Sequence, residues 1–501
     1  MPRIDTMTSN RSLRFLAAVA ALAAAAAAQA PFTIGNLVVA RVGDGTSTLS
    51  SATAPVFLDE YTPAGVLVQS LALPTAPNGN NRQFTFRGGS SSEGFLTVST
   101  NGLYLMLAGY DVPPGAAVAL TEQAPASTTN RVVARIDLSG QIDTTTALGD
   151  AYNGSPTIAG NFRSVVSEDG QSFWLSGTGA TGSAGVRYVA ALGDTTSLTL
   201  QAGAPSNTRV ASVYDGQLYT TSASTVYLGV VKIGDGLPTT GGQTSTLLTG
   251  FPTTGGTAAS SAYDFFFADP DTLYVADDNA VNSTIGGINK WTRDPITGTW
   301  TRQYRLQLGG AGAQTAARGL TGFVQNGVTT LYATCNTSGA ATTTLVSIVD
   351  TGPTSTVNSL LVSPANTAFR GVRLLTKPST IQRFPAACGT TGITMSGNGE
   401  LGTTVRTTLR NPVGFPFVGY GLTQIGLPVI PGCACTLGHD FSLLVGTPLP
   451  PAAAADALLI PNNPALIGTA VLAQGLDLFA PGGCTSPLDF TLTDYFRFTI
   501  Q

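Results

Sequence analysis

The chain has 501 residues, of which 10% are charged and 43% are hydrophobic, and its formal net charge is −4. Its lysines and arginines form no basic cluster that could neutralise a row of phosphates, so we expect no nucleic-acid partner. The single histidine excludes a zinc motif that needs two histidines.

The first 28 residues are typical of a secretory signal peptide. A positive region contains Arg3, Arg11 and Arg14. The apolar run Phe15–Ala28 follows, and it is too short to span a hydrocarbon core of ~30 Å. We expect cleavage after Ala28; the alternative is a buried alanine-rich helix. The mature protein is therefore expected to be secreted or at the cell surface, without a transmembrane segment.

A short phrase recurs five times between residues 31 and 378. In each copy, an Asn-Gly, Asp-Gly or Asp-Pro-Asp turn comes just before an apolar-aromatic pair. The pairs are Leu103-Tyr104, Phe173-Trp174, Leu218-Tyr219, Leu273-Tyr274 and Leu331-Tyr332. Such turns supply the positive φ values of tight hairpins, and the pair begins an alternating strand. A spacing of 45 to 70 residues between the aromatics fits a repeat of four antiparallel strands.

A second phrase precedes each turn and contains one charged residue. The residues are Arg87, Arg163, Arg209, Asp264, Arg318 and Arg370. The phrase occurs six times, but only five apolar-aromatic pairs follow it. We expect Leu37–Val42 to supply the missing strand beside Phe369–Leu374, which would join the two ends of a ring. Residues 31–378 are therefore predicted to form an all-β, six-bladed β-propeller, with five or seven blades as the alternatives.

These turns resemble those of secreted bacterial β-propellers of the lactonase-like and NHL-like kinds. The segment Asp271–Asn279, which reads DTLYVADDN, is the most similar stretch. The resemblance implies the fold. It implies no particular activity, because such hairpins serve unrelated functions.

Residues 379–501 lack the repeated apolar-aromatic phrase and are predicted to form a disulfide-stabilised β-sandwich. The segment resembles a module that closes many secreted bacterial proteins, through its Cys388-Gly389 opening, Pro431–Cys433, and Ile460–Gly468 followed by Gln474. The resemblance implies no catalytic role; attachment or export would be consistent with it.

Four of the five cysteines lie in this segment: Cys388, Cys433, Cys435 and Cys484. A bridge between Cys433 and Cys435 would close a very small, strained ring, so we expect Cys388 and Cys484 each to pair with one of these two. The alternative is a zinc site of four thiolates. Cys335 is expected to be a buried, small apolar residue.

Few residues point to catalysis. A Ser-His-Asp triad would have to use His439, which we expect to be a turn residue. Oxygen-bearing side chains follow one aromatic pair, at Asp277, Asp278, Asn279 and Asn282. They could hold Ca²⁺, although solvated turn residues are the simpler interpretation. No catalytic residue, metal or other cofactor is predicted.

The recurring arginines are the sharpest candidate site. Placed near the axis of a propeller, five guanidinium groups would attract a carboxylate or sulfate, with Asp264 interrupting the ring. The alternative is that each arginine binds loop carbonyls or a carboxylate of the next blade. The sequence favours a non-enzymatic binding or cell-surface structural protein, with an acidic glycan or a protein as partner. The alternative is a channel-mouth hydrolase or lyase of the lactonase-like kind.

Overall fold

The computed structural model describes most of the chain after the predicted signal peptide, whose residues 1–28 lie outside the described part. The described residues are 29–201, 203–255, 260–279, 284–308, 316–336, 343–428, 435–440, 442–445, 449, 454–484 and 489–501. They form an almost purely β structure with two 3₁₀ turns, η1 (Val118–Leu120) and η3 (Pro464–Leu466). Within these residues, no helix has the length and hydropathy needed to cross a membrane.

Four consecutive antiparallel sheets of four strands each occupy residues 162–362. The first contains β10 (Phe162–Val166), β11 (Phe173–Gly177), β12 (Arg187–Val189) and β13 (Leu198–Thr199). The second contains β14 (Thr208–Tyr214), β15 (Gln217–Ser224), β16 (Tyr227–Ile233) and β17 (Ser245–Leu247). The third contains β18 (Ala262–Asp269), β19 (Thr272–Asp277), β20 (Gly287–Arg293) and β21 (Trp300–Leu306). The fourth contains β22 (Ala316–Gln325), β23 (Val328–Asn336), β24 (Thr343–Val349) and β25 (Val357–Val362).

The preceding strands follow the same plan, with a divided first strand. The strands are β4 (Thr85–Arg87), β5 (Thr97–Val98), β6 (Tyr104–Tyr110), β7 (Arg131–Asp137), β8 (Ile142–Asp143) and β9 (Ala147–Leu148). Both β4 and β5 pair with β6, which pairs with β7, and both β8 and β9 pair with the far edge of β7. Two separated pieces therefore replace the continuous inner strand of the other sheets.

The N-terminal strand pairs with a late strand, as the sequence predicts. Strand β1 (Leu37–Val42) lies antiparallel to β26 (Ala368–Leu374), with Leu37 opposite Leu374 and Val42 opposite Ala368. On its other side β1 pairs with β2 (Thr53–Tyr61), which pairs with β3 (Leu67–Ala72). Residues from opposite ends of the repeat region thus build one unit.

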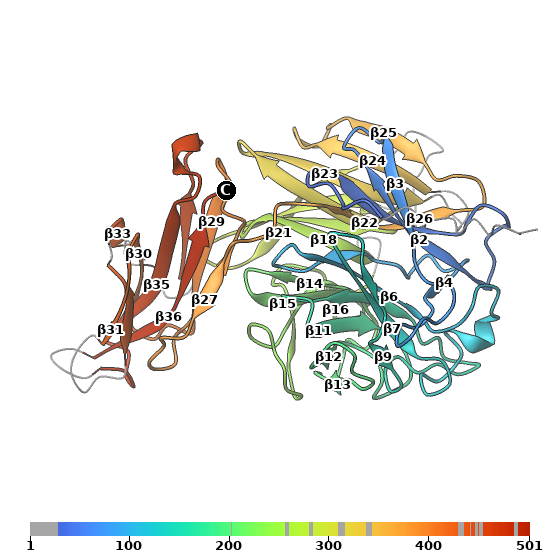
Figure 1. The fold of residues 1–501 in the computed structure, drawn as a ribbon, viewed down its shortest axis with the longest axis horizontal. Helices are drawn as coiled ribbons and strands as arrows, with labels where there is room; N and C mark the ends of the chain where they lie inside the picture. The colour runs from blue at the N-terminus through green and yellow to red at the C-terminus, as the bar shows by residue number, and fades with distance from the viewer. Residues whose placement is uncertain are drawn as a thin grey trace, which may run out of the picture.

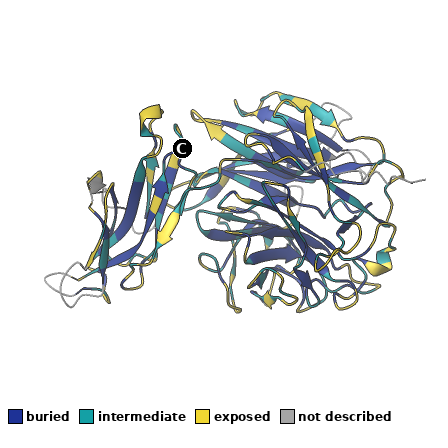
Figure 2. Cartoon of the chain, in the orientation of Figure 1, coloured by how far each residue is buried: buried dark blue, intermediate teal, exposed yellow. Residues whose placement is uncertain are grey.

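The first strands of successive sheets contact one another in a closed circuit, which is an arrangement of the β-propeller type (Figure 1). Strand β5 contacts β10, and the contacts continue through β14, β18, β22 and β26 back to β5. Buried apolar clusters fill the space between neighbouring sheets, so the inner strands are mostly buried, whereas outer strands such as β3 and β25 are partly exposed (Figure 2). The circuit brings the residues before each turn close to a common axis.

The recurring turn and apolar-aromatic pair mark the second strand of each sheet. Tyr104, Trp174, Tyr219, Tyr274 and Tyr332 lie in β6, β11, β15, β19 and β23. The glycine of the preceding turn has φ of +75° at Gly102, +75° at Gly170 and +62° at Gly216. These values favour glycine, because a Cβ is disfavoured at positive φ. The repeated turn phrase therefore reports a real structural repeat.

The C-terminal strands form two sheets and one hairpin. The larger sheet contains β27 (Gln382–Phe384), β36 (Phe490–Thr499), β35 (Ala470–Leu478), β30 (Phe415–Gly421) and β33 (Leu444–Val445). The smaller contains β28 (Gly392–Ser396), β29 (Thr404–Arg410) and β34 (Ala455–Leu459), and the hairpin is β31 (Gln424–Pro428) with β32 (Thr436–His439). The two sheets share one apolar core, to which Val405, Val418 and Phe498 contribute.

This C-terminal region, coloured orange to red in Figure 1, contacts the β14–β15 turn. The Asp215 carboxylate accepts a hydrogen bond from the Thr408 hydroxyl at 2.5 Å, and its carbonyl accepts one from Arg410 Nη2 at 2.5 Å. Burial raises the pKa of Asp215. A partly buried acceptor thus links the two regions.

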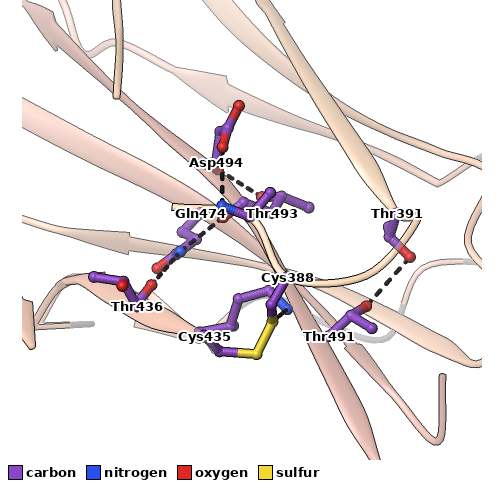
Figure 3. Close-up of a disulfide and its surroundings, with 10 residues drawn as sticks. Cys388, Thr391, Cys435, Thr436, Gln474, Thr491, Thr493 and Asp494 are labelled. Atoms are coloured by element: carbon purple, nitrogen blue, oxygen red, sulfur yellow. Dashed lines mark hydrogen bonds between the residues drawn. A yellow bond between two sulfur atoms is a disulfide. The ribbon is translucent and has the colours of Figure 1, made fainter. Parts of the chain in front are cut away.

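A disulfide joins Cys388 to Cys435, with their Cα atoms 5.0 Å apart (Figure 3). It agrees with the expected pairing of Cys388 with one member of the Cys-x-Cys pair and excludes the four-thiolate zinc site. Cys484 is also disulfide-bonded, and Cys433 lies outside the described residues. Cys335 is a free, buried cysteine, and burial raises the pKa of its thiol to about 12.

His439 is not a turn residue, contrary to the prediction. It lies in β32 opposite Gln424 and is completely buried. Burial lowers its pKa to about 4, so the imidazole is neutral at pH 7. The Gly-His-Asp sequence was misleading because β32 extends through His439, and only Asp440 lies beyond the strand, where its carboxylate accepts a hydrogen bond from Ser442 Oγ at 2.9 Å.

Candidate functional site: an arginine cluster

In four of the inner strands, a β-bulge interrupts the pairing with the adjacent strand at the position of an arginine. The register of β10, β14, β22 and β26 with the adjacent strand shifts at Arg163, Arg209, Arg318 and Arg370 respectively. A bulge leaves one residue outside the ladder and re-aims its side chain. The recurring arginine therefore has a local structural cause. Together with Arg87, at the end of β4, these four residues are called the arginine cluster below.

In β18 the slip lies between Ala262 and Phe265, and Tyr263 takes the arginine's place. The guanidinium carbon of Arg209 lies 3.9 Å from the centre of the Tyr263 ring, and that of Arg318 lies 4.8 Å from it. Such cation–π contacts stabilise a charge that is partly removed from water. Tyr263 is therefore a member of the site that the sequence interpretation passed over in favour of its neighbour.

Asp264 does not lie among the cluster arginines. Its side chain is completely buried and accepts hydrogen bonds from Arg373 Nη1 at 2.7 Å and Nη2 at 3.0 Å, and from the Leu320 amide at 3.0 Å. Strands β18, β22 and β26 meet at this carboxylate. Asp264 is thus an ion-pair partner that links three consecutive units.

Two cluster arginines bind the first residues of the next sheet. Arg163 Nη1 donates to Asn207 Oδ1 at 2.5 Å and to the Thr208 carbonyl at 2.9 Å. Arg209 Nη1 donates to Ser261 Oγ and the Ala262 carbonyl, each at 3.0 Å. These are the contacts expected if the arginines hold neighbouring blades together.

Two others bind the segment between β4 and β5. Arg318 Nη1 donates to the Ser91 carbonyl, and its Nη2 lies 2.8 Å from the Asp278 carboxylate. Arg370 Nη2 donates to the Gly88 carbonyl at 3.1 Å. The same Asp278 carboxylate lies 3.7 Å from Arg209. One carboxylate is therefore shared between two guanidinium groups.

A pair of glutamates adjoins Arg87. Glu122 lies 2.6 Å from Arg87 Nη1, and Asn161 Nδ2 donates to both Glu122 at 2.8 Å and Glu93 at 3.0 Å. Tyr110 donates a further hydrogen bond to Glu93 at 2.6 Å. Glu93 is buried, which raises its pKa, so the two carboxyl groups have unlike environments. Glu93 was not identified from the sequence, where its only signal is that it is a single acidic residue in a stretch of serines and glycines.

The cluster holds more positive than negative charge. Among the described residues, Arg163 and Arg370 donate hydrogen bonds only to neutral oxygens, and burial lowers the pKa of each guanidinium to about 10, so both stay charged at pH 7. Within the same part of the chain, the buried Nε atoms of Arg87, Arg163, Arg318 and Arg370 have no hydrogen-bond partner. The cluster can therefore supply further donors to an anion.

Little space is open at the cluster. A cavity of about 10 Å³, enough for one water molecule, is lined by residues that include Ser91, Phe95, Arg318 and Arg370. The ring of Phe95 packs against that of Tyr263, with the ring centres 5.3 Å apart. A ligand larger than water would require some of these groups to move.

The candidate calcium ligands have other roles. Asp277 is completely buried and accepts hydrogen bonds from Ser260 Oγ and the Ser261 amide, each at 2.8 Å, whereas Asp278 pairs with arginines. Asn282 lies outside the described residues. Among the described side chains, no three or more of His, Cys, Asp and Glu are grouped as for a metal ion. Asp277 is thus a buried acceptor and not a solvated turn residue.

No protein-family model and no curated protein matches the chain. Several solved structures resemble it at low similarity. A protein from Lactobacillus plantarum is 11% identical, with 84% of this chain and 99% of that chain covered and a TM-score of 0.33. An exo-β-1,3-galactanase from Phanerochaete chrysosporium, solved with galactose, is 10% identical over 87% of this chain and 98% of its own, with a TM-score of 0.33.

The β-fructofuranosidase BmSUC1 of Bombyx mori is 11% identical, with 94% of each chain covered and a TM-score of 0.26. Two of the three names describe glycoside-cleaving enzymes. All three TM-scores are below 0.5, so no function is transferred from these proteins, and the arginine cluster has to be interpreted from its own geometry.

Proposed function

We propose that this chain is a secreted protein in which residues 31–378 form a six-bladed β-propeller and residues 379–501 a β-sandwich. Removal of residues 1–28 would release it from the cell, and the sandwich would serve attachment. Support for six blades comes from the circuit of six inner strands and from the β1–β26 pairing. Support for the sandwich comes from the core shared by two C-terminal sheets.

Its proposed activity is to bind an acidic glycan, or another ligand with a carboxylate or sulfate group, at the arginine cluster. The observation that carries this proposal is that Arg163 and Arg370 are buried without a carboxylate partner among the described residues. Each is buried and, in the part of the chain that the structure describes, donates hydrogen bonds only to neutral oxygens. Burying a charge without a counter-ion is costly, and a bound anion would offset that cost.

Arg163→Ala is expected to weaken binding of a galacturonic-acid hexamer about ten- to a hundredfold, because one charge-assisted hydrogen bond contributes roughly 1.5–3 kcal/mol. The substitution leaves no carboxylate without its partner, so the melting temperature should fall only slightly. Titration calorimetry at two salt concentrations measures the affinity, and thermal unfolding measures the stability.

The matched control is Arg293→Ala, which removes a partly exposed arginine at the end of β20 that pairs with Asp271 and does not belong to the arginine cluster. Its affinity for the hexamer should equal that of the wild type. A sharp loss of stability in Arg163→Ala with unchanged affinity would show that the arginine only joins blades, and the proposal would then be wrong.

A second candidate function, glycoside hydrolysis, is favoured by the Glu93–Glu122 pair. The raised pKa of Glu93 suits a general acid, which would protonate the leaving oxygen of the sugar. Glu122, held 2.6 Å from Arg87 Nη1, would take the proton from the attacking water. In this reaction the glycosidic C–O bond breaks and the water oxygen forms the new bond to the sugar carbon.

Hydrolysis predicts that Glu122→Gln lowers kcat by at least about a hundredfold while the affinity for the intact glycan persists. Release of reducing ends from polygalacturonate and from neutral polysaccharides measures the rate. No reducing ends from any of these substrates, together with normal binding, would leave the binding function alone.

A further inference from the structure

The segment Gly88–Leu96, called the plug below, separates β4 from β5. In the other units the inner strand continues through its bulge, whereas here nine residues with the sequence GGSSSEGFL replace it. The plug is rich in glycine and serine, which form few apolar contacts of their own. Phe95 and Leu96 at its C-terminal end are buried, and Glu93 accepts hydrogen bonds from Tyr110 and Asn161, whereas the glycines and serines are held mainly by polar contacts with other units.

The plug contacts strands from three other units. The Ser91 and Gly88 carbonyls accept hydrogen bonds from Arg318 in β22 and Arg370 in β26. The Gly94 carbonyl accepts one from the Gly371 amide at 2.9 Å. Phe95 packs against Tyr263 of β18. A single segment thus ties one unit to the others at the arginine cluster.

The packing around Gly94 shows how closely the plug fits. Its φ is +79°, and a Cβ placed there would lie 2.6 Å from the Phe86 ring and 3.0 Å from the Arg370 side chain. Only glycine therefore lets the backbone lie against Arg370 in this conformation. The Ser91 and Gly88 carbonyls accept hydrogen bonds from guanidinium groups, and the oxygens of a bound anion would accept bonds from the same groups.

We propose that the plug is a displaceable occupant of the arginine cluster, and that an anionic ligand binds by replacing the Ser91 and Gly88 carbonyls with its own oxygens. The inference rests on the proposed binding function. A carboxylate or sulfate carries a negative charge and can accept two parallel hydrogen bonds from one guanidinium group, whereas a neutral carbonyl offers neither advantage, and this difference supplies a driving force for exchange. The measured affinity then equals the intrinsic affinity multiplied by the fraction of molecules in which the plug is displaced, and this fraction is small.

Phe95→Ala tests this directly, because it removes the aromatic contact that holds the plug without touching an arginine. We expect the affinity for the galacturonic-acid hexamer to rise roughly tenfold, since a larger fraction of molecules is open. Phe415→Ala, which truncates an exposed aromatic residue in β30, is the control and should leave the affinity unchanged. Equal or weaker binding by a folded Phe95→Ala protein would overturn the proposal.

Hydrogen–deuterium exchange on the wild-type protein gives a second measurement that needs no variant. The hexamer should increase exchange at Gly88–Leu96 while it protects the strands that carry the arginines; increased protection of the plug would overturn the proposal. Binding without plug displacement would leave the binding function standing. If neither the wild type nor Phe95→Ala binds any acidic saccharide, both the binding function and the plug proposal are wrong.

Discussion

Asp264→Ala is expected to lower the free energy of unfolding by about 3–5 kcal/mol, the usual cost of removing one partner from a buried ion pair. The carboxylate is fully buried, and Arg373 would be left without its counter-ion. The Leu320 amide would lose its acceptor as well. Because these groups come from β18, β22 and β26, the substitution weakens contacts among three units. Urea unfolding followed by tryptophan fluorescence measures the effect.

Two further variants separate the ion pair from simple packing loss. Replacing both partners, as Asp264→Leu with Arg373→Met, should be much less destabilising than Asp264→Ala, because no buried charge then remains unpaired. Asp271→Ala, which removes the partly exposed partner of Arg293, should cost no more than about 1 kcal/mol. A loss near that small value for Asp264→Ala would contradict the role assigned to this carboxylate.

Removal of the Cys388–Cys435 disulfide, as the double serine variant, is expected to destabilise the C-terminal region by about 4 kcal/mol. The bridge spans 47 residues, and the figure follows from the chain entropy that a loop of this length regains when it is opened. Leu492 lies beside the bridge, and its amide donates to the Cys388 sulfur at 3.2 Å, so the loss should extend into β36.

The distribution of tryptophan makes this experiment selective. All three tryptophans, Trp174, Trp291 and Trp300, lie before residue 379, so their fluorescence reports only on the proposed propeller. The fluorescence midpoint in urea should stay unchanged in the double serine variant, while hydrogen exchange in β29 and β35 increases. Equal exchange in the variant and the wild type would show that the bridge adds no stability.

The repeated turns could be predicted from the sequence because their cause is local. An Asn-Gly or Asp-Gly turn followed by an alternating strand needs no distant partner to be identified, and the aromatic residue of all five pairs does lie in a second strand. The β1–β26 pairing could be predicted because the sequence contains six first-strand phrases but only five second-strand phrases, so a strand from elsewhere in the chain had to complete the last unit. The pairing of Cys388 with one of Cys433 and Cys435 followed from the strain that a bridge between those two would carry.

The contents of the arginine cluster could not be predicted in the same way. In the phrase around Tyr263-Asp264, a charged residue was aligned with the arginines, whereas the bulge in β18 gives that position to Tyr263. A bulge shifts side chains by one residue and leaves no compositional mark. The plug was missed for a related reason, because a glycine-serine stretch is typical of a surface loop and shows nothing of its contacts with Arg318 and Arg370.

The pairing of β1 with β26 has a consequence for how the chain is made. Strand β1 leaves the ribosome early, but its partner is complete only when Leu374 has been translated. Until then the hydrogen-bonding groups of β1 that face β26 have no mate, and the last sheet of the circuit stays unfinished. The nascent chain consequently remains incompletely folded through most of its synthesis, which is the state in which a polypeptide can be threaded through a narrow translocation pore.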